Sequence, residues 1–164
     1  MKHLLVTNDF PPKIGGIQSL LWERWRRLPA DRFAVLTSPY AGAAAWDAEQ
    51  AFRVERGSRG VLTPTPSLIR RIDALADEID ADLVLLDPAL PLGAIGPRLS
   101  RPYGLILHGA EVTVPGRLPV AGQLLARILR SASLIVAAGN YPMAEAARCA
   151  GRSRTGWGRI VRRG

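Results

Sequence analysis

Two adjacent glycines are the first residues whose type and position could support chemistry. Gly15 and Gly16 end a proline-containing loop and stand where a helix is expected to begin. Residues without side chains let the backbone approach a phosphate closely, and a helix N-terminus offers free N–H groups and positive potential. The pattern fits an anion-binding loop and equally a tight strand-to-helix turn, which would use the same two residues. It matches neither the G-x-G-x-x-G fingerprint nor a Walker A loop, which argues against a nicotinamide dehydrogenase.

A histidine and a glutamate follow the apolar segment at 103–107. His108 stands where a strand would end, and there an imidazole can donate to or accept from a ligand hydroxyl. A purely structural hydrogen bond is the alternative. Glu111 could act as a general base, as a hydroxyl acceptor or as a solvated loop carboxylate. Neither residue decides the function by itself.

Other polar residues at the ends of apolar segments have ordinary explanations. Asn140, which precedes Tyr141, fits a helix N-cap, and Asp87 before Pro88 fits turn chemistry. No Ser-His-Asp triad, pair of acidic carboxylates or metal-ligand cluster is evident in the sequence. We therefore predict neither a metal site nor a bound cofactor.

The elements that must position these residues alternate along the chain. Apolar runs predict strands at 2–7, 32–38, 51–57, 82–87, 103–108 and 133–138. Amphipathic stripes predict helices at 17–28, 67–80, 90–100, 118–130 and 141–150. Strands of near-continuous Val, Leu and Ile separated by helices are typical of a parallel sheet covered on both faces. We predict a doubly wound, Rossmann-like α/β domain over residues 1–151.

In such a sheet, ligands bind outside the carboxyl ends of the strands. This rule selects four loops, at residues 8–16, 87–91, 108–117 and 139–142. It also predicts that Asn8, His108 and Gly139 lie at the same edge of the sheet.

Charge and composition exclude several classes of protein. The formal net charge is +8, but the segment 152–164 holds five arginines and no acid, so the rest is only weakly basic. This is not the pattern of a nucleic-acid-binding body. No apolar run is long enough to span a membrane, and the start is unlike a secretory signal. With a single cysteine, the sequence predicts a cytoplasmic protein without disulfides.

Tryptophan and arginine gather near the end of one expected helix. Trp22, Trp25 and Arg26 form this group, and Arg70-Arg71 open another helix. Indole and guanidinium groups suit an anionic bilayer surface, so a peripheral membrane contact on the inner face of the plasma membrane is one hypothesis. A solvated helix face is the alternative.

Three strings together carry a family resemblance: NDFPPKIGGIQ, LHGAEVTVPGR and AAGNYP. They resemble the amino-terminal lobe of the family 4 retaining glycosyltransferases, which have the two-lobed GT-B fold. More narrowly, they resemble actinobacterial mannosyltransferases that transfer mannose from GDP-mannose to phosphatidylinositol mannosides. The likeness extends from about Lys2 to Gly151.

The resemblance implies roles for residues at matching positions. Gly15 and Gly16 would approach the donor diphosphate, and His108 would contact the transferred sugar. The acceptor cleft would be bordered by Glu111, Arg117, Asn140 and Tyr141. The implied partners are GDP-mannose and a glycolipid acceptor, with no protein nucleophile and no metal.

The sequence also departs from this family. The second lobe, which supplies most of the nucleotide site there, has no counterpart in the 164 residues, and the likeness stops at Gly151. We therefore expect residues 152–164 to form a basic, disordered tail and the chain to be a truncated, inactive fragment. A non-catalytic domain that binds a membrane surface or another partner is the alternative function.

Overall fold

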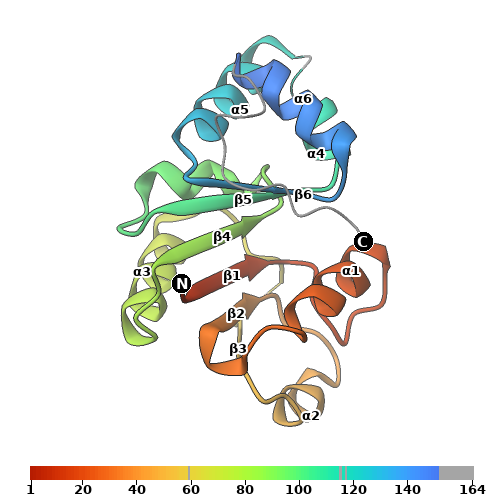
Figure 1. Ribbon diagram of the computed structural model, residues 1–164. Helices are drawn as coiled ribbons and strands as arrows, with labels where there is room; N and C mark the ends of the chain where they lie inside the picture. The colour runs from red at the N-terminus through yellow and green to blue at the C-terminus, as the bar shows by residue number, and fades with distance from the viewer. Residues whose placement is uncertain (59, 115, 117, 152–164) are drawn as a thin grey trace.

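The computed structural model describes residues 1–58, 60–114, 116 and 118–151 (Figure 1). The segment 152–164, which we expected to be a disordered tail, and Arg117 lie outside the described residues. No helix in the described part is long and apolar enough to cross a membrane.

Six parallel strands form one sheet in the order β3-β2-β1-β4-β5-β6. The strands are β1 (His3–Thr7), β2 (Phe33–Thr37), β3 (Arg53–Arg56), β4 (Leu83–Asp87), β5 (Tyr103–Leu107) and β6 (Leu134–Ala137). The five-residue strands are buried along their whole length, as expected where helices cover both faces. This confirms the predicted doubly wound, Rossmann-like fold.

Helices connect the strands and cover the sheet. The longer helices are α1 (Gly16–Trp25), α3 (Pro66–Glu78), α5 (Pro119–Ser131) and α6 (Asn140–Ala150). The short ones are α2 (Ala43–Ala48), α4 (Ala110–Thr113) and the 3-10 helices η1 (Ala30–Arg32) and η2 (Leu92–Arg98). The sequence pattern predicted neither α2 nor α4, because six and four residues are too few to show a helical period.

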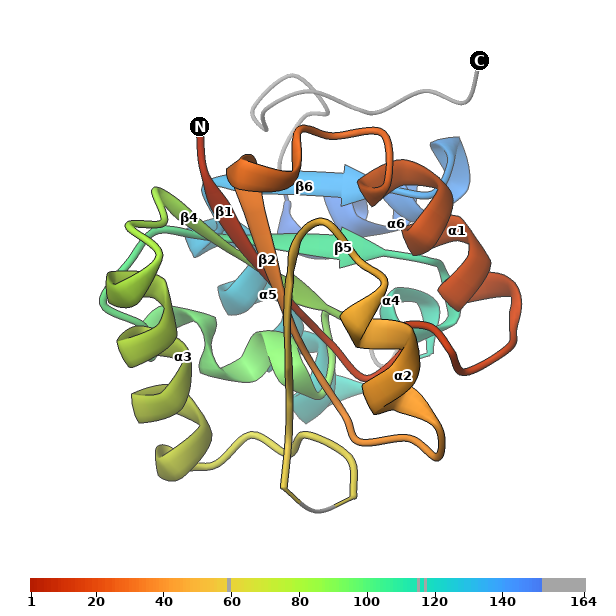
Figure 2. The same cartoon turned by 90° about the horizontal axis from the view of Figure 1, so that it is seen from below.

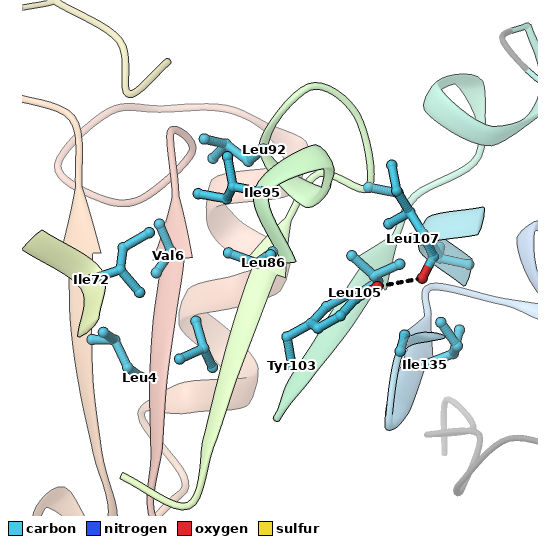
Figure 3. Packing of buried hydrophobic residues seen from close by; sticks show 14 of the residues in the cluster. Leu4, Val6, Ile72, Leu86, Leu92, Ile95, Tyr103, Leu105, Leu107 and Ile135 are labelled. Carbon is cyan, nitrogen blue, oxygen red and sulfur yellow. Dashed lines mark hydrogen bonds between the residues drawn. The ribbon is translucent and has the colours of Figure 1, made fainter. Parts of the chain in front are cut away.

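Two apolar clusters lie on the two faces of the sheet. One unites Leu4 and Val6 of β1 with α3, η2, α5 and α6, and Figure 3 shows Ile72, Leu92 and Leu105 within it. The other joins Leu5 of β1 with α1 and the aromatic residues near it. Figure 2 shows α3 and α1 on opposite sides of β1 and β2. Successive β1 residues enter different clusters because side chains alternate across a strand.

The aromatic residues of α1 belong to the core. Trp25 is only 5% exposed, and its indole N–H donates to Nε2 of His3 at 2.9 Å. Trp22 packs edge-on against Trp46 of α2. The hypothesis that Trp25 faces a membrane is therefore corrected, since this residue lies one turn after Leu21 on the face that packs against the sheet.

The arginines of the same hypothesis lie at the surface. Arg26 is exposed and pairs with Glu23 at 2.9 Å. On α3, Arg70 is exposed, whereas Arg71 donates to the carbonyl of Arg56 at 2.7 Å. The charge of Arg26 is thus partly compensated on its own helix.

Candidate functional site

The strand order reverses between β1 and β4, with β2 and β3 beyond β1 and β5 and β6 beyond β4. The crevice at such a reversal is where open α/β sheets bind ligands. All six strands are parallel, so the loops after β1, β4, β5 and β6 leave at the same edge. The predicted shared edge for Asn8, His108 and Gly139 is confirmed.

A hydrogen-bonded chain connects the ends of β1, β4 and β5. Asp87, at the end of β4, is fully buried, and its Oδ1 lies 2.6 Å from Nε2 of His108. Its Oδ2 accepts from the Thr7 hydroxyl at 2.6 Å, and that hydroxyl accepts the backbone N–H of Asp9 at 2.9 Å. A carboxylate only accepts, so Nε2 of His108 carries a proton and Nδ1 is left for a ligand.

The environment of His108 favours its charged form. Burial alone would lower the pKa of the imidazole. The hydrogen bond and charge of Asp87 act against this, together with the charges of Glu111 and Asp9, and the pKa of His108 is raised above its ordinary value. The imidazole can therefore present an acceptor at Nδ1 when it is neutral and a positively charged donor when it is protonated.

The loop after β1 is held by Asp9. Its Oδ1 accepts from Lys13 Nζ at 2.8 Å and from Gln18 Nε2 at 2.6 Å. A side chain at Gly15 would collide with the amide of Gln18, whereas the space beside Gly16 is open. The first N–H groups of α1 therefore stand next to a position that a ligand can approach, as an anion site requires.

Glu111 turns back toward the backbone. Its carboxylate accepts the N–H groups of His108 and Gly109, the latter at 3.0 Å from Oε2. A glutamate in a first helical turn commonly caps in this way. Here the bonds fix the loop directly behind the imidazole, so Glu111 orients His108 through the backbone.

The loop after β6 brings the other expected residues to this edge. Tyr141 is exposed, and its hydroxyl accepts from Thr113 Oγ1 at 3.3 Å. Asn140 is exposed but is not the N-cap of α6, because Gly139 occupies that position. Asn8 has a structural role: its amide makes two hydrogen bonds with the backbone of Leu62.

Sequence reasoning missed the hydrogen-bonded partners that support this site. Asp87 was explained as turn chemistry, and neither Thr7 nor Asp9 was singled out. The available signal was position: all three end or follow a strand at the edge that the fold selects for ligands.

The chain was compared with known proteins. No family model matches it. It is 35% identical over 159 residues to the GDP-mannose-dependent alpha-(1-6)-phosphatidylinositol monomannoside mannosyltransferase of Mycolicibacterium smegmatis, covering 92% of this chain and 41% of that protein. The Mycobacterium tuberculosis protein of the same name is 38% identical over 149 residues, with coverage of 84% and 38%. The chain thus spans about two fifths of the length of the curated relatives it matches.

Solved structures agree on the fold. Anabaena HepE in complex with UDP superposes with a TM-score of 0.68 at 21% identity, over 100% of this chain and 44% of that one. The complex with UDP and glucose gives a TM-score of 0.67. The chain is therefore a homologue of part of the GDP-mannose-dependent phosphatidylinositol mannoside mannosyltransferases, with the fold of one lobe of a GT-B glycosyltransferase.

Proposed function

We propose that this chain forms the lobe of a retaining mannosyltransferase that meets the sugar and the acceptor, with GDP-mannose as donor and a phosphatidylinositol mannoside as acceptor. The observation that carries the proposal is the imidazole of His108, held by buried Asp87 where the strand order reverses. The relatives' printed names supply the donor and the acceptor class.

Two groups of this lobe would bind the donor. The N-terminus of α1, with open space at Gly16, would offer backbone N–H groups to the diphosphate. Nδ1 of His108 would bond a hydroxyl of the mannose, and Asp87 would hold the ring in place.

In the transfer itself, the bond between mannose C1 and the diphosphate oxygen breaks, and C1 bonds to the acceptor oxygen. The acceptor hydroxyl's proton passes to the departing diphosphate, and GDP leaves. An oxocarbenium-like centre develops between these events, so the protein acts by positioning and by stabilising charge. A raised pKa lets His108 remain protonated beside the departing anion.

The acceptor would enter beside the loops after β5 and β6. Tyr141 and Asn140 are exposed there, and Thr113 links the two loops through the tyrosine hydroxyl. Arg117 follows in the same loop of the sequence. A phosphatidylinositol mannoside is anchored in a bilayer, so the lobe would work at a membrane surface.

A two-lobed hybrid enzyme tests the proposal, with residues 1–151 joined to the remainder of the Mycolicibacterium smegmatis relative. We expect His108→Ala to reduce kcat about 100-fold or more, while the Kd for GDP-mannose changes less than about threefold. Asp87→Asn should reduce kcat less, because the ring is present but poorly held. His3→Gln, at the opposite edge of the sheet, is the control.

Full transfer by the His108→Ala hybrid would remove this residue from the site. If the hybrid has no activity at all, the proposal is judged on the 164-residue chain by NMR. GDP-mannose should then shift the His108 imidazole and Gly16 amide signals, and unchanged signals at both positions would count against the assignment.

A further inference from the structure

Two buried threonines end neighbouring strands on the same face of the sheet. Thr7 ends β1 and Thr37 ends β2, and the two residues are partners in the register of these strands. Side chains at paired positions of neighbouring strands point to the same face. Both threonines are fully buried, but their hydroxyl groups differ. The hydroxyl of Thr37 makes no hydrogen bond with any described residue, whereas that of Thr7 makes two.

The Thr7 hydroxyl is used as both donor and acceptor. Its proton goes to Oδ2 of Asp87 at 2.6 Å, and its oxygen accepts the backbone N–H of Asp9 at 2.9 Å. Thr7 and Asp87 are also partners in the register of β1 and β4, so the strand pairing brings them together. The unpaired hydroxyl of Thr37 shows that burial at this level of the sheet does not by itself supply partners. The contacts of Thr7 therefore reflect its place beside Asp87.

Asp87 depends on Thr7 for its orientation. Its carboxylate is fully buried, with Oδ1 2.6 Å from Nε2 of His108 and Oδ2 bonded to the Thr7 hydroxyl. The last torsion of an aspartate side chain has a broad range, so one hydrogen bond leaves the carboxylate free to turn. Two hydrogen bonds, one to each oxygen, fix its plane. The Thr7 hydroxyl thus determines where Oδ1 stands, and with it the direction in which the His108 ring presents Nδ1.

The same hydroxyl connects the histidine with the loop after β1. The N–H group of Asp9 belongs to this loop, and the Asp9 carboxylate in turn holds Lys13 and Gln18. The N-terminus of α1 and the imidazole of His108, which we proposed as the donor-binding groups, are therefore linked through one hydroxyl. Catalysis by positioning requires that such groups keep a fixed relative arrangement.

We propose that Thr7 is a positioning residue for mannosyl transfer: its hydroxyl holds the Asp87 carboxylate, and through it the His108 ring, in place beside the loop that receives the diphosphate. The inference rests on the proposed function, in which His108 bonds the transferred sugar. Thr7 touches neither donor nor acceptor in this scheme and acts only through Asp87 and Asp9. Its loss should lower the rate of transfer more than donor binding, because the ring remains present but is less well aligned.

NMR of the 164-residue chain tests the positioning without an activity assay. The probe is the proton on Nε2 of His108, which the bond to Asp87 protects from exchange with water. Thr7→Val removes the hydroxyl and keeps the shape, Thr7→Ser keeps the hydroxyl, and Thr37→Val removes the neighbouring hydroxyl that has no partner. We expect exchange about tenfold faster in Thr7→Val and within about twofold of the unmodified chain in the other two.

The two-lobed hybrid supplies the rate of transfer. Thr7→Val should reduce kcat about tenfold and change KM for GDP-mannose less than about twofold, and Thr7→Ser should retain most of the activity. Thr37→Val should leave both constants unchanged. Equal losses in the two valine variants would overturn the proposal, because they would reflect the removal of any buried hydroxyl at this level of the sheet.

The remaining outcomes separate this inference from the proposed function. Loss of transfer in His108→Ala but not in Thr7→Val would reject the role of Thr7 and keep the proposed function. Full transfer by His108→Ala would count against the proposed function, and the Nε2 proton would then decide whether Thr7 holds the ring. Thr7→Ala replaces Thr7→Val if the latter does not fold. A rapidly exchanging Nε2 proton in the unmodified chain would overturn the inference without any variant.

Discussion

At the scale of single residues, two histidines show how environment decides the chemistry of one side-chain type. Nε2 of His108 faces the buried carboxylate of Asp87, and the pKa of the imidazole is raised. Nε2 of His3 instead accepts the indole N–H of Trp25, which requires that nitrogen to be unprotonated. Burial lowers the pKa of His3 from 6.5 to about 4. His108 is therefore suited to a charged ligand, and His3 to the neutral core.

His3 should make the stability of the fold depend on pH. The unfolded chain binds a proton at His3 below its ordinary pKa of 6.5, and the folded chain only below about 4. Between these values the unfolded state holds more protons, so the free energy of unfolding falls as the pH falls. For a shift of this size the loss approaches about 3 kcal/mol.

The variant His3→Gln provides the comparison, because an amide oxygen can also accept the Trp25 N–H and does not titrate. Urea unfolding at pH 7 and pH 4 should show a smaller loss of stability in this variant than in the unmodified chain. Equal losses in the two proteins would mean that protonation of His3 is not coupled to folding.

At the scale of elements, Arg56 at the end of β3 fixes the loop that leads to Gly15 and Gly16. Its side chain is 12% exposed, and it makes a two-pronged ion pair with Asp47 of α2 at 2.8 Å. The same guanidinium donates to the carbonyl of Pro11 at 2.6 Å. One arginine therefore joins β3, α2 and the loop after β1.

Arg56→Lys should destabilise the fold, because an ammonium group cannot reproduce this planar arrangement of donors. We expect a loss of about 1–3 kcal/mol and a Tm lower by about 3–10 °C. Arg53→Lys is the matched control: Arg53 pairs with Glu55 and Glu78 at the surface, where such pairs contribute about 1 kcal/mol or less. Similar melting temperatures for the two variants would show that the contacts of Arg56 contribute no more to stability than the surface pairs of Arg53.

The strands and the longer helices could be predicted because each carries an apolar pattern, whereas α2 and α4 are too short to show one. The strands were recognised as continuous apolar runs, and α3 and α5 by their apolar stripes. The edge that holds His108 followed from the parallel order alone. The hydrogen bond between His108 and Asp87 could not be predicted, because the two residues are 21 positions apart in the sequence. It depends on β4 and β5 being neighbours in the sheet. The inward direction of Trp25 depends likewise on how α1 is rotated against the sheet.

At the scale of the whole molecule, the described lobe offers few groups to a nucleotide-sugar. The N-terminus of α1 can meet a diphosphate and His108 can meet a sugar, while Lys13 is already paired with Asp9. The family resemblance assigns the guanine, the ribose and most of the phosphate charge to a second lobe. These 164 residues are related to about two fifths of the length of such proteins.

We therefore predict that the 164-residue chain alone binds GDP-mannose only at about millimolar concentrations and transfers no mannose. Each missing charge-assisted contact costs about 1.5–3 kcal/mol, so losing three weakens a micromolar site about a thousandfold or more. Calorimetry and a radiolabelled-mannose assay measure the two quantities. ADP-mannose is the informative competitor: the lobe alone should bind it as weakly as GDP-mannose, whereas the two-lobed hybrid should prefer guanine. Micromolar binding or base discrimination by the lobe alone would show that it holds the nucleotide itself, and the division of the donor site between two lobes would then be wrong.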